Sequence, residues 1–259
     1  MEKHIFKKKY GQNFLQNDNV LDRIVNLFDV DEYSKIIEVG PGDGALTKKL
    51  LNKNISVLSF EIDESLKKFL DNIKNDNFRV IYKDFLSINL NDYFKKEDKL
   101  YFIANIPYYI TTPIITKFID DDVIPEVMIL MVQKEVGERL SAKPKTSKYG
   151  AITAILNYYF DITYEFTVER DNFYPIPNVD SCIIKLSKKQ NTEKCDFNKY
   201  KTLIYDAFKQ KRKNLKNNLK NYDLEIIENV LKKHDLDLTN RAEDLNYKIF
   251  IDITNNLKK

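Results

Sequence analysis

The stretch Lys35-Ile36-Ile37-Glu38-Val39-Gly40-Pro41-Gly42-Asp43-Gly44-Ala45-Leu46-Thr47 decides the fold. It opens with a β-branched run that is typical of a buried strand, continues with three glycines at alternate positions, and leads into an amphipathic run from Leu46 to Leu51 that predicts a helix. Glycine permits positive φ and lets a ligand approach the bare backbone, and the start of the next helix offers free N–H groups. The stretch therefore predicts a strand-turn-helix unit that binds a ligand, although a purely structural turn would use the same glycines.

Similar strand and helix patterns alternate on the C-terminal side of this unit. A helical pattern with apolar residues at spacings of three and four covers Ser65 to Ile73. Repeated strand-helix-strand units predict an α/β fold whose mostly parallel sheet has helices on both faces. The runs Tyr164 to Val168 and Ser181 to Leu186 have only a proline-containing loop between them, which predicts an antiparallel hairpin at the sheet edge. The strands expected in the parallel part are 35–40, 55–60, 78–82, 100–104 and 127–132.

The pattern changes after Leu186, because residues 187–194 are polar and have no period. Beyond this linker, apolar residues recur at helical spacing, which predicts a small all-helical domain. The expected domains are therefore residues 1–187 and residues 195–259. The helices expected in the second domain are 200–208, 215–219, 224–231 and 249–257.

Composition excludes several classes of protein. The chain has 259 residues, of which 43% are hydrophobic and 31% are charged, as expected for a globular protein with a real core. Its apolar runs are far shorter than the roughly 18 residues of a membrane span, and the N-terminus is not signal-like, so we expect a cytoplasmic protein with no membrane partner. Two cysteines, Cys182 and Cys195, and two histidines, His4 and His234, offer no metal-ligand spacing, so we expect no metal site.

The glycine turn has an acidic partner at the end of the second expected strand. Glu61 follows Gly40 by about the 20 residues at which an acid meets the ribose hydroxyls in nucleotide-binding α/β folds. The dinucleotide motif would need glycine where Ala45 stands, and the phosphate-loop motif is absent. S-adenosylmethionine has no phosphates to cradle, and Asp84 after the third strand could accept a hydrogen bond from its adenine amine. A turn-initiating role for Asp84 explains that residue equally well.

The sharpest feature follows the fourth expected strand, in Asn105-Ile106-Pro107-Tyr108. Ligands in open α/β sheets bind beyond the carboxyl ends of the strands, so this loop and the glycine turn should border one crevice. If the Asn105 oxygen and a carbonyl of residue 106 or 107 accept both hydrogens of an aromatic amine, its lone pair is steered toward a methyl donor. Pro107 limits how the loop carbonyls point, and Tyr108 offers a face on which a base can stack. The alternative is a proline turn with core aromatics.

Six separated segments, taken together, resemble one known family: the bacterial 16S rRNA adenine dimethyltransferases, the kasugamycin-resistance enzymes, within the rRNA adenine N6-methyltransferases. The resemblance covers almost the whole chain. The residues that carry it are Lys9 to Leu15, Glu38 to Thr47, Asn105 to Tyr108, Met131 to Val136, Phe173 to Ser181 and Ala207 to Lys213.

The resemblance implies a Rossmann-like S-adenosylmethionine-dependent methyltransferase domain and a helical RNA-binding domain. The enzyme would dimethylate N6 of two adjacent adenosines near the 3′ end of 16S rRNA in a pre-ribosomal particle, and we expect it to work as a monomer. The target adenine would lie between Tyr108 and Phe173, with its amine held by the Asn105 loop. The residues that the resemblance places on the cofactor are Asn13, Leu15, Gly40, Glu61, Asp84 and Asn105.

Three other functions remain open at this stage. A macrolide-resistance enzyme would methylate large-subunit rRNA, but the Gln133 to Val136 segment and the run around Lys211 favour the small-subunit branch. A DNA adenine methyltransferase more often has proline where Ile106 stands. A non-catalytic nucleic-acid-binding scaffold would not need the intact glycine turn together with Asn105.

The overall charge of +3 is small for an RNA-binding protein, but it is unevenly distributed. Residues 1–12 carry +3, residues 133–148 carry +3 and residues 207–220 carry +6, which leaves −9 for the rest of a chain whose total is +3. We expect Lys211, Arg212 and Lys213 to contact RNA phosphates, although lysine lacks the bidentate geometry of arginine. Lysines that only keep a helical surface soluble are the alternative.

Overall fold

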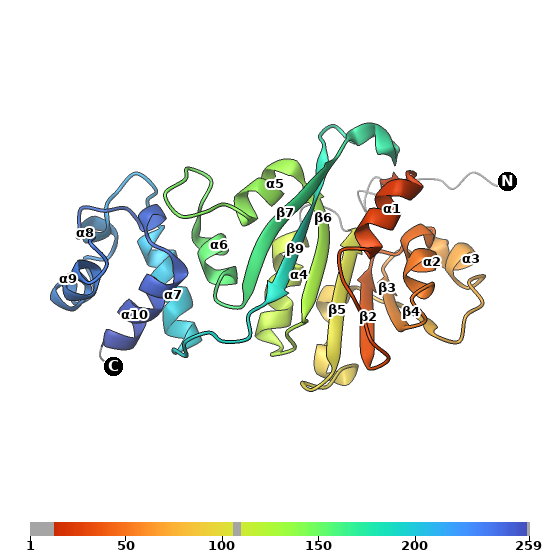
Figure 1. The fold of residues 1–259 in the computed structure, drawn as a ribbon, viewed down its shortest axis with the longest axis horizontal. Coiled ribbons are helices and arrows are strands. Elements are labelled where there is room, and N and C mark those ends of the chain that lie inside the picture. The colour runs from red at the N-terminus through yellow and green to blue at the C-terminus, as the bar shows by residue number, and fades with distance from the viewer. Residues whose placement is uncertain (1–12, 106–109, 258–259) are drawn as a thin grey trace. The chain divides into compact units, whose positions relative to one another are not determined.

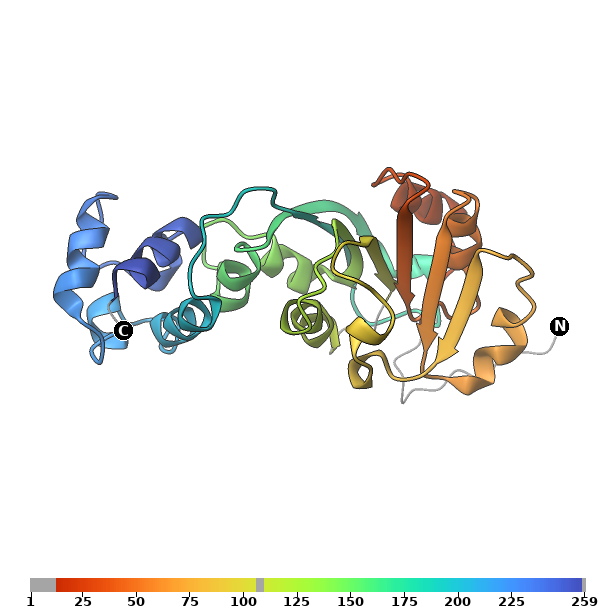
Figure 2. The same ribbon diagram turned by 90° about the horizontal axis from the view of Figure 1, so that it is seen from below.

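The structure is a computed structural model that describes residues 13–105 and 110–257. The chain divides into two compact units, residues 1–137 with 163–188 and residues 138–162 with 189–259. The first unit contains most of a seven-stranded sheet in the order β4-β3-β2-β5-β6-β9-β7 (Figures 1 and 2). The strands are β2 (Ser34–Val39), β3 (Ser56–Glu61), β4 (Phe78–Tyr82), β5 (Lys99–Asn105), β6 (Val127–Gln133), β7 (Phe160–Val168) and β9 (Ser181–Lys188).

The first five strands of that order are parallel to one another, as the alternating strand and helix patterns predict. β9 pairs antiparallel with β6, and β7 forms the edge beyond β9, so the predicted Rossmann-like fold with an antiparallel edge is confirmed. β7 begins four residues before the expected strand because Phe160 and Ile162 are buried in alternation with exposed Asp161 and Thr163.

Helices cover both faces of this sheet. α1 (Asp18–Val25) and α2 (Ala45–Leu51) share one apolar core with sheet residues such as Ile36 and Ile103. On the opposite face, Phe118 of α4 (Thr111–Asp120) packs edge-on against Phe102, with ring centroids 4.7 Å apart. Successive residues of β5 contribute to the two faces in turn, because their side chains point to opposite sides of the sheet.

The helix expected from Ser65 to Ile73 is shorter than predicted. It is a 3₁₀ turn, Glu64–Leu66, followed by a single α-helical turn, α3 (Lys67–Leu70). The Asn72 side chain donates a hydrogen bond to the Lys68 carbonyl, at 2.6 Å, and this local contact competes with continuation of the helix.

A second, two-stranded sheet was not predicted. β1 (Phe14–Leu15) pairs antiparallel with β8 (Phe173–Tyr174), with Leu15 opposite Phe173. The junction is strengthened by the Asn17 side-chain amide, which donates to the Asn172 side-chain oxygen at 2.7 Å. Residues near the start of the chain are therefore held beside the loop that precedes β9.

The second unit is helical and has its own core. Its helices include α6 (Ala151–Leu156), α7 (Phe197–Ala207), α8 (Leu215–Asn218), α9 (Leu224–Lys232) and α10 (Tyr247–Asn256), while α5 (Lys134–Leu140) spans the boundary between units. The predicted division at residues 187–195 needs correction, because Tyr149, Ala154 and Ile155 pack in the same core as the C-terminal helices. Within the described residues, no helix is long and apolar enough to span a membrane.

Candidate active site

A cavity of about 350 Å³ lies at the carboxyl ends of the parallel strands in the first unit. That volume is within the range of small-molecule sites, and the position is the usual one for ligands of open α/β sheets. Seven of the residues that the sequence assigned to the site line it: Asn13, Leu15, Gly40, Glu61, Asp84, Asn105 and Phe173. Pro107 and Tyr108, the other two assigned residues, lie outside the described residues.

The glycine turn after β2 is built from positive φ angles. Gly40, Gly42 and Gly44 have φ of 72°, 62° and 82°. A Cβ atom on Gly42 would come within 2.7 Å of the Phe14 ring, and one on Gly40 would come within 3.1 Å of the Asn105 carbonyl oxygen. The turn thus needs glycine for its conformation and for the close approach of β1 and β5.

Glu61 closes the turn from the end of β3. Its carboxylate accepts hydrogen bonds from the backbone N–H of Gly42, at 3.3 Å, and of Asp63, at 2.8 Å. The residue is only 6% exposed, and burial raises the pKa of its carboxyl group. The group therefore offers a buried acceptor at the cavity wall, directly beside the glycine turn.

Glu38, one residue before the end of β2, lies deeper than Glu61. One of its oxygens accepts hydrogen bonds from the hydroxyls of Thr47 and Ser59, both at 2.7 Å, whereas the other has no partner among the described residues. Because Glu38 is only 1% exposed, burial raises the pKa of its carboxyl group to about 7. The three side chains join β2, α2 and β3 on either side of the glycine turn.

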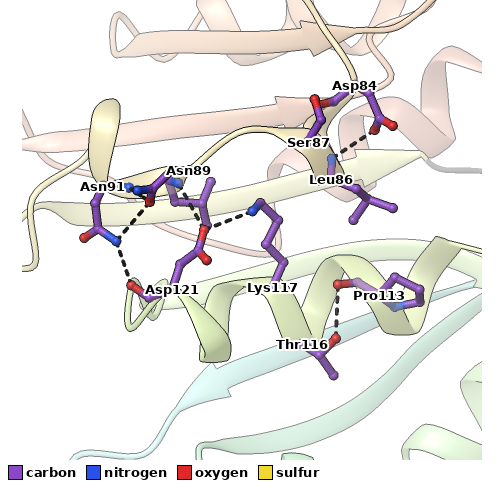
Figure 3. A network of polar contacts seen from close by, with 10 residues as sticks. Asp84, Leu86, Ser87, Asn89, Asn91, Pro113, Thr116, Lys117 and Asp121 are labelled. Carbon is purple, nitrogen blue, oxygen red and sulfur yellow. Dashed lines mark hydrogen bonds and ion pairs between the residues drawn. The ribbon is translucent and has the colours of Figure 1, made fainter.

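Asp84 has a structural contact as well as a place at the cavity wall. Its Oδ1 accepts a hydrogen bond from the Leu86 N–H at 2.9 Å and caps a short 3₁₀ turn (Figure 3). The turn-initiating role considered from the sequence is therefore present, and the exposed carboxylate also borders the cavity.

The segment after Asp84 is tied to the end of α4. The Asp121 carboxylate accepts from the Leu90 N–H at 3.0 Å and pairs with Lys117 at 3.0 Å, and the Asn91 side chain donates to the Asp121 carbonyl at 3.0 Å (Figure 3). These contacts connect the chain between β4 and β5 to the helix that follows the Asn105 loop.

Asn105 and Phe173 reach the cavity from different elements. Asn105 is the last residue of β5 and pairs in register with Met131 of β6. Phe173 is 3% exposed, and its position depends on the pairing of β8 with β1. That pairing also brings Leu15 to the cavity, so residues 158 positions apart in the sequence line the same space.

Several lining residues were not found from the sequence. Phe14 contacts the turn through its ring, Ile62 lies at the rim with 46% of its surface exposed, and Met131 and Ile183 form part of the wall. The strand patterns contained a signal for Met131, since it lies near the carboxyl end of the strand expected at residues 127–132. Phe14 and Ile183 need the three-dimensional pairing of distant strands.

The fold and the cavity together define a Rossmann-like methyltransferase. The model of the family described as "Ribosomal RNA adenine dimethylase" matches residues 3–259. The chain belongs to this family and is thus an rRNA adenine dimethyltransferase.

Relatives and solved structures agree with this assignment. The chain is 41% identical to "Ribosomal RNA small subunit methyltransferase A" of Mycoplasma mobile over 95% of this chain and 96% of the relative, and 38% identical to the protein of that name from Bacillus cytotoxicus over 97% and 91%. It resembles the crystal structure of a dimethyladenosine transferase from Plasmodium falciparum, with a TM-score of 0.77, 27% identity and coverage of 92% and 95%. The 23S rRNA methyltransferase ErmE, at 23% identity with coverage of 95% and 100%, shares the fold, with a TM-score of 0.74.

Proposed function

We propose that this protein uses S-adenosylmethionine to dimethylate N6 of two adjacent adenosines near the 3′ end of 16S rRNA, in a pre-ribosomal particle. The observation that carries the proposal is the convergence of the glycine turn, Glu61, Asp84 and Asn105 on one cavity in a chain of this family. The small-subunit substrate is supported by relatives about 40% identical whose names specify it.

The residues of the cavity fit S-adenosylmethionine. Gly40 and Gly42 line the cavity without side chains, so a ligand there meets bare backbone of the turn. Glu61 provides an acceptor for the ribose hydroxyls, and the exposed Asp84 provides one for the adenine amine. Asn13 and Leu15 border the same space from the N-terminal side. When bound, the cofactor supplies a methyl group on a sulfonium that carries its own leaving group.

The catalytic part of the proposal concerns the target amine. The lone pair of an aromatic amine is delocalised into its ring, which makes the nitrogen a poor nucleophile. Asn105 accepts one N6 hydrogen through its side-chain oxygen, a carbonyl of the following loop accepts the other, and the lone pair is thereby directed at the methyl carbon. Phe173 packs against the base on one side. From the sequence alone, Tyr108 is assigned to the opposite face of the base, and Pro107 is assigned to hold the loop in one conformation. Positioning supplies much of the rate enhancement in such a site.

The RNA partner is supported by a basic segment in the second unit. Its six basic side chains are exposed, and none forms an ion pair with a carboxylate in the described part of the chain: Lys209, Lys211, Arg212, Lys213, Lys216 and Lys220. An unpaired cation that contacts a phosphate releases a counterion, which gives affinity without sequence preference. We propose that the protein acts as a monomer in the cytoplasm.

A methylation assay tests this function. Purified protein and S-adenosylmethionine are added, in separate reactions, to small and to large ribosomal subunits that lack the modification, and mass spectrometry of each rRNA counts the methyl groups. We expect two methyl groups on each of two adjacent adenosines. Asn105→Ala should abolish transfer while largely sparing RNA binding, and Asn198→Ala, an exposed exchange at the start of α7, should leave both unchanged. Methyl groups found only in large-subunit rRNA would refute the proposal, and none in any particle would favour a non-catalytic scaffold.

A further inference from the structure

The cavity has a second, apolar part that the assigned cofactor contacts do not use. The polar groups that border it belong to the glycine turn and to the ends of β3, β4 and β5. On the face of the sheet covered by α1, the wall is made of hydrocarbon and thioether side chains. They are Leu21, Ile24, Ile103, Ile129, Met131 and Ile183.

Strand register places two of these residues in line with Asn105. Asn105 pairs with Met131, and Met131 pairs with Ile183, so the three residues form one row across β5, β6 and β9. Neighbouring strands lie about 4.8 Å apart, and residues paired in register point to the same face. All three border the cavity; Met131 is 3% exposed, whereas Ile183, at 0%, has no free surface and packs beside Met131 within the wall. An apolar surface thus begins one strand away from the group that holds the target amine.

Dimethylation requires such a surface. After the first transfer, N6 carries a methyl group in place of one hydrogen, and one of the two hydrogen bonds that oriented the amine is lost. In the second transfer the N6 lone pair forms a new bond to carbon, the bond from that carbon to sulfur breaks with its electrons left on sulfur, and the remaining N6 proton passes to solvent. Unless the first methyl group has an apolar site beside Asn105, it displaces the nitrogen from this geometry.

We propose that Met131, packed in the wall beside Ile183, receives the first methyl group, and that these two side chains thereby determine that the product is N6,N6-dimethyladenosine. The inference rests on the proposed function, since it assumes that an adenine N6 lies at Asn105. Burying one methyl group in such a site strengthens binding about fourfold, the equivalent of about 0.8 kcal/mol. The protein should therefore bind N6-methyladenosine at least as tightly as adenosine and carry it on to the second transfer.

Polar variants of matched size test this site. Met131→Gln places a polar group of similar size at the wall, and Met131→Leu keeps it apolar; Ile183→Thr and Ile183→Val are equal in size to each other and differ only in the hydroxyl that Thr adds. Met128→Gln makes the same exchange in the same strand on the opposite face, away from the cavity. The substrate is small subunits that lack the modification. We expect the polar variants to make the first transfer within about twofold of the native rate and the second transfer about four- to tenfold more slowly than the native protein. N6-methyladenosine should therefore accumulate. The apolar variants and Met128→Gln should retain the native ratio of products.

A binding measurement without S-adenosylmethionine provides an independent readout. Fluorescence anisotropy compares oligoribonucleotides that carry one adenosine or one N6-methyladenosine, and Met131→Gln should lower the preference for the methylated oligonucleotide about fourfold or more. An unchanged product ratio and an unchanged preference in both polar variants would overturn the methyl site and leave the proposed function intact. Absence of any methyl transfer by the native protein would instead overturn the proposed function, and the methyl site with it.

Discussion

Glu38 gives the first unit a pH dependence that can be calculated. Its pKa of about 7 in the folded protein, against the usual 4.5, follows from burial, with a smaller contribution from the nearby negative charge of Glu61. Between these two values the folded protein keeps a proton that the unfolded chain has lost, so the free energy of unfolding falls as pH rises. Each pH unit is worth about 1.4 kcal/mol, which makes the total about 3 kcal/mol, lost by the time pH passes 7.

The substitution Glu38→Gln removes the titration while keeping a side-chain oxygen for the hydroxyls of Thr47 and Ser59. We therefore expect the stability of the variant relative to the native protein to increase by about 2.5 kcal/mol between pH 5 and pH 8, since part of the total is already lost at pH 5. Urea denaturation followed by circular dichroism gives the free energies of unfolding at each pH. Hydrogen exchange of β2 peptides identifies the transition that belongs to the first unit.

Glu228→Gln is the matched control, because the side chain of Glu228 in α9 is 41% exposed and pairs only with Lys232 among the described residues. That exchange should shift stability by less than about 1 kcal/mol at either pH. The reasoning would be refuted if the free energies of unfolding of Glu38→Gln and of the native protein changed in parallel from pH 5 to pH 8. Parallel changes would mean that Glu38 is ionised throughout this range.

Two further predictions concern the glycine turn and the basic segment. Gly42→Ala should destabilise the protein by about 1–2 kcal/mol and weaken S-adenosylmethionine binding in calorimetry, because it places a Cβ at positive φ and within 2.7 Å of Phe14. Gly150→Ala is the control: the added Cβ would have nothing within 4 Å, so stability and binding should both stay unchanged. Replacing Lys211, Arg212 and Lys213 by Gln should weaken RNA binding and flatten its dependence on salt by about 0.7 to 0.9 in log–log slope for each lost phosphate contact; an unchanged slope would show that these side chains do not bind phosphate.

The sequence predicted the central sheet well because its signals are local. Each parallel strand is a short run rich in β-branched or aromatic residues, and the glycines, Glu61 and Asn105 stand at strand ends, where the α/β architecture itself assembles a site. Asp84 shows the limit of such reasoning, because the residue both caps a turn and borders the cavity, and the sequence pattern fits either role alone.

The features that were missed depend on contacts between distant segments. A two-residue strand such as Phe14–Leu15 has no periodicity, so its pairing with β8 leaves no trace in the sequence. Apolar periodicity shows that Tyr149 and Ile155 are buried, but not against which elements, and the domain boundary was misplaced for that reason. Phe173 entered the predicted site only through the family resemblance, since a lone aromatic residue in that pattern would otherwise be assigned to the core.

The pairing of β1 with β8 has a consequence for the biosynthesis of the protein. The hydrogen bond between Asn17 and Asn172 joins residues that are 155 positions apart, and it lies next to the strand pair whose Leu15 and Phe173 line the cavity. At about 5–20 residues per second, a ribosome adds the second partner about 8 to 30 s after the first. Until then the nascent chain contains the glycine turn and Asn105 but lacks one wall of the site. A chain still attached early in translation is therefore inactive toward the ribosomal RNA around it.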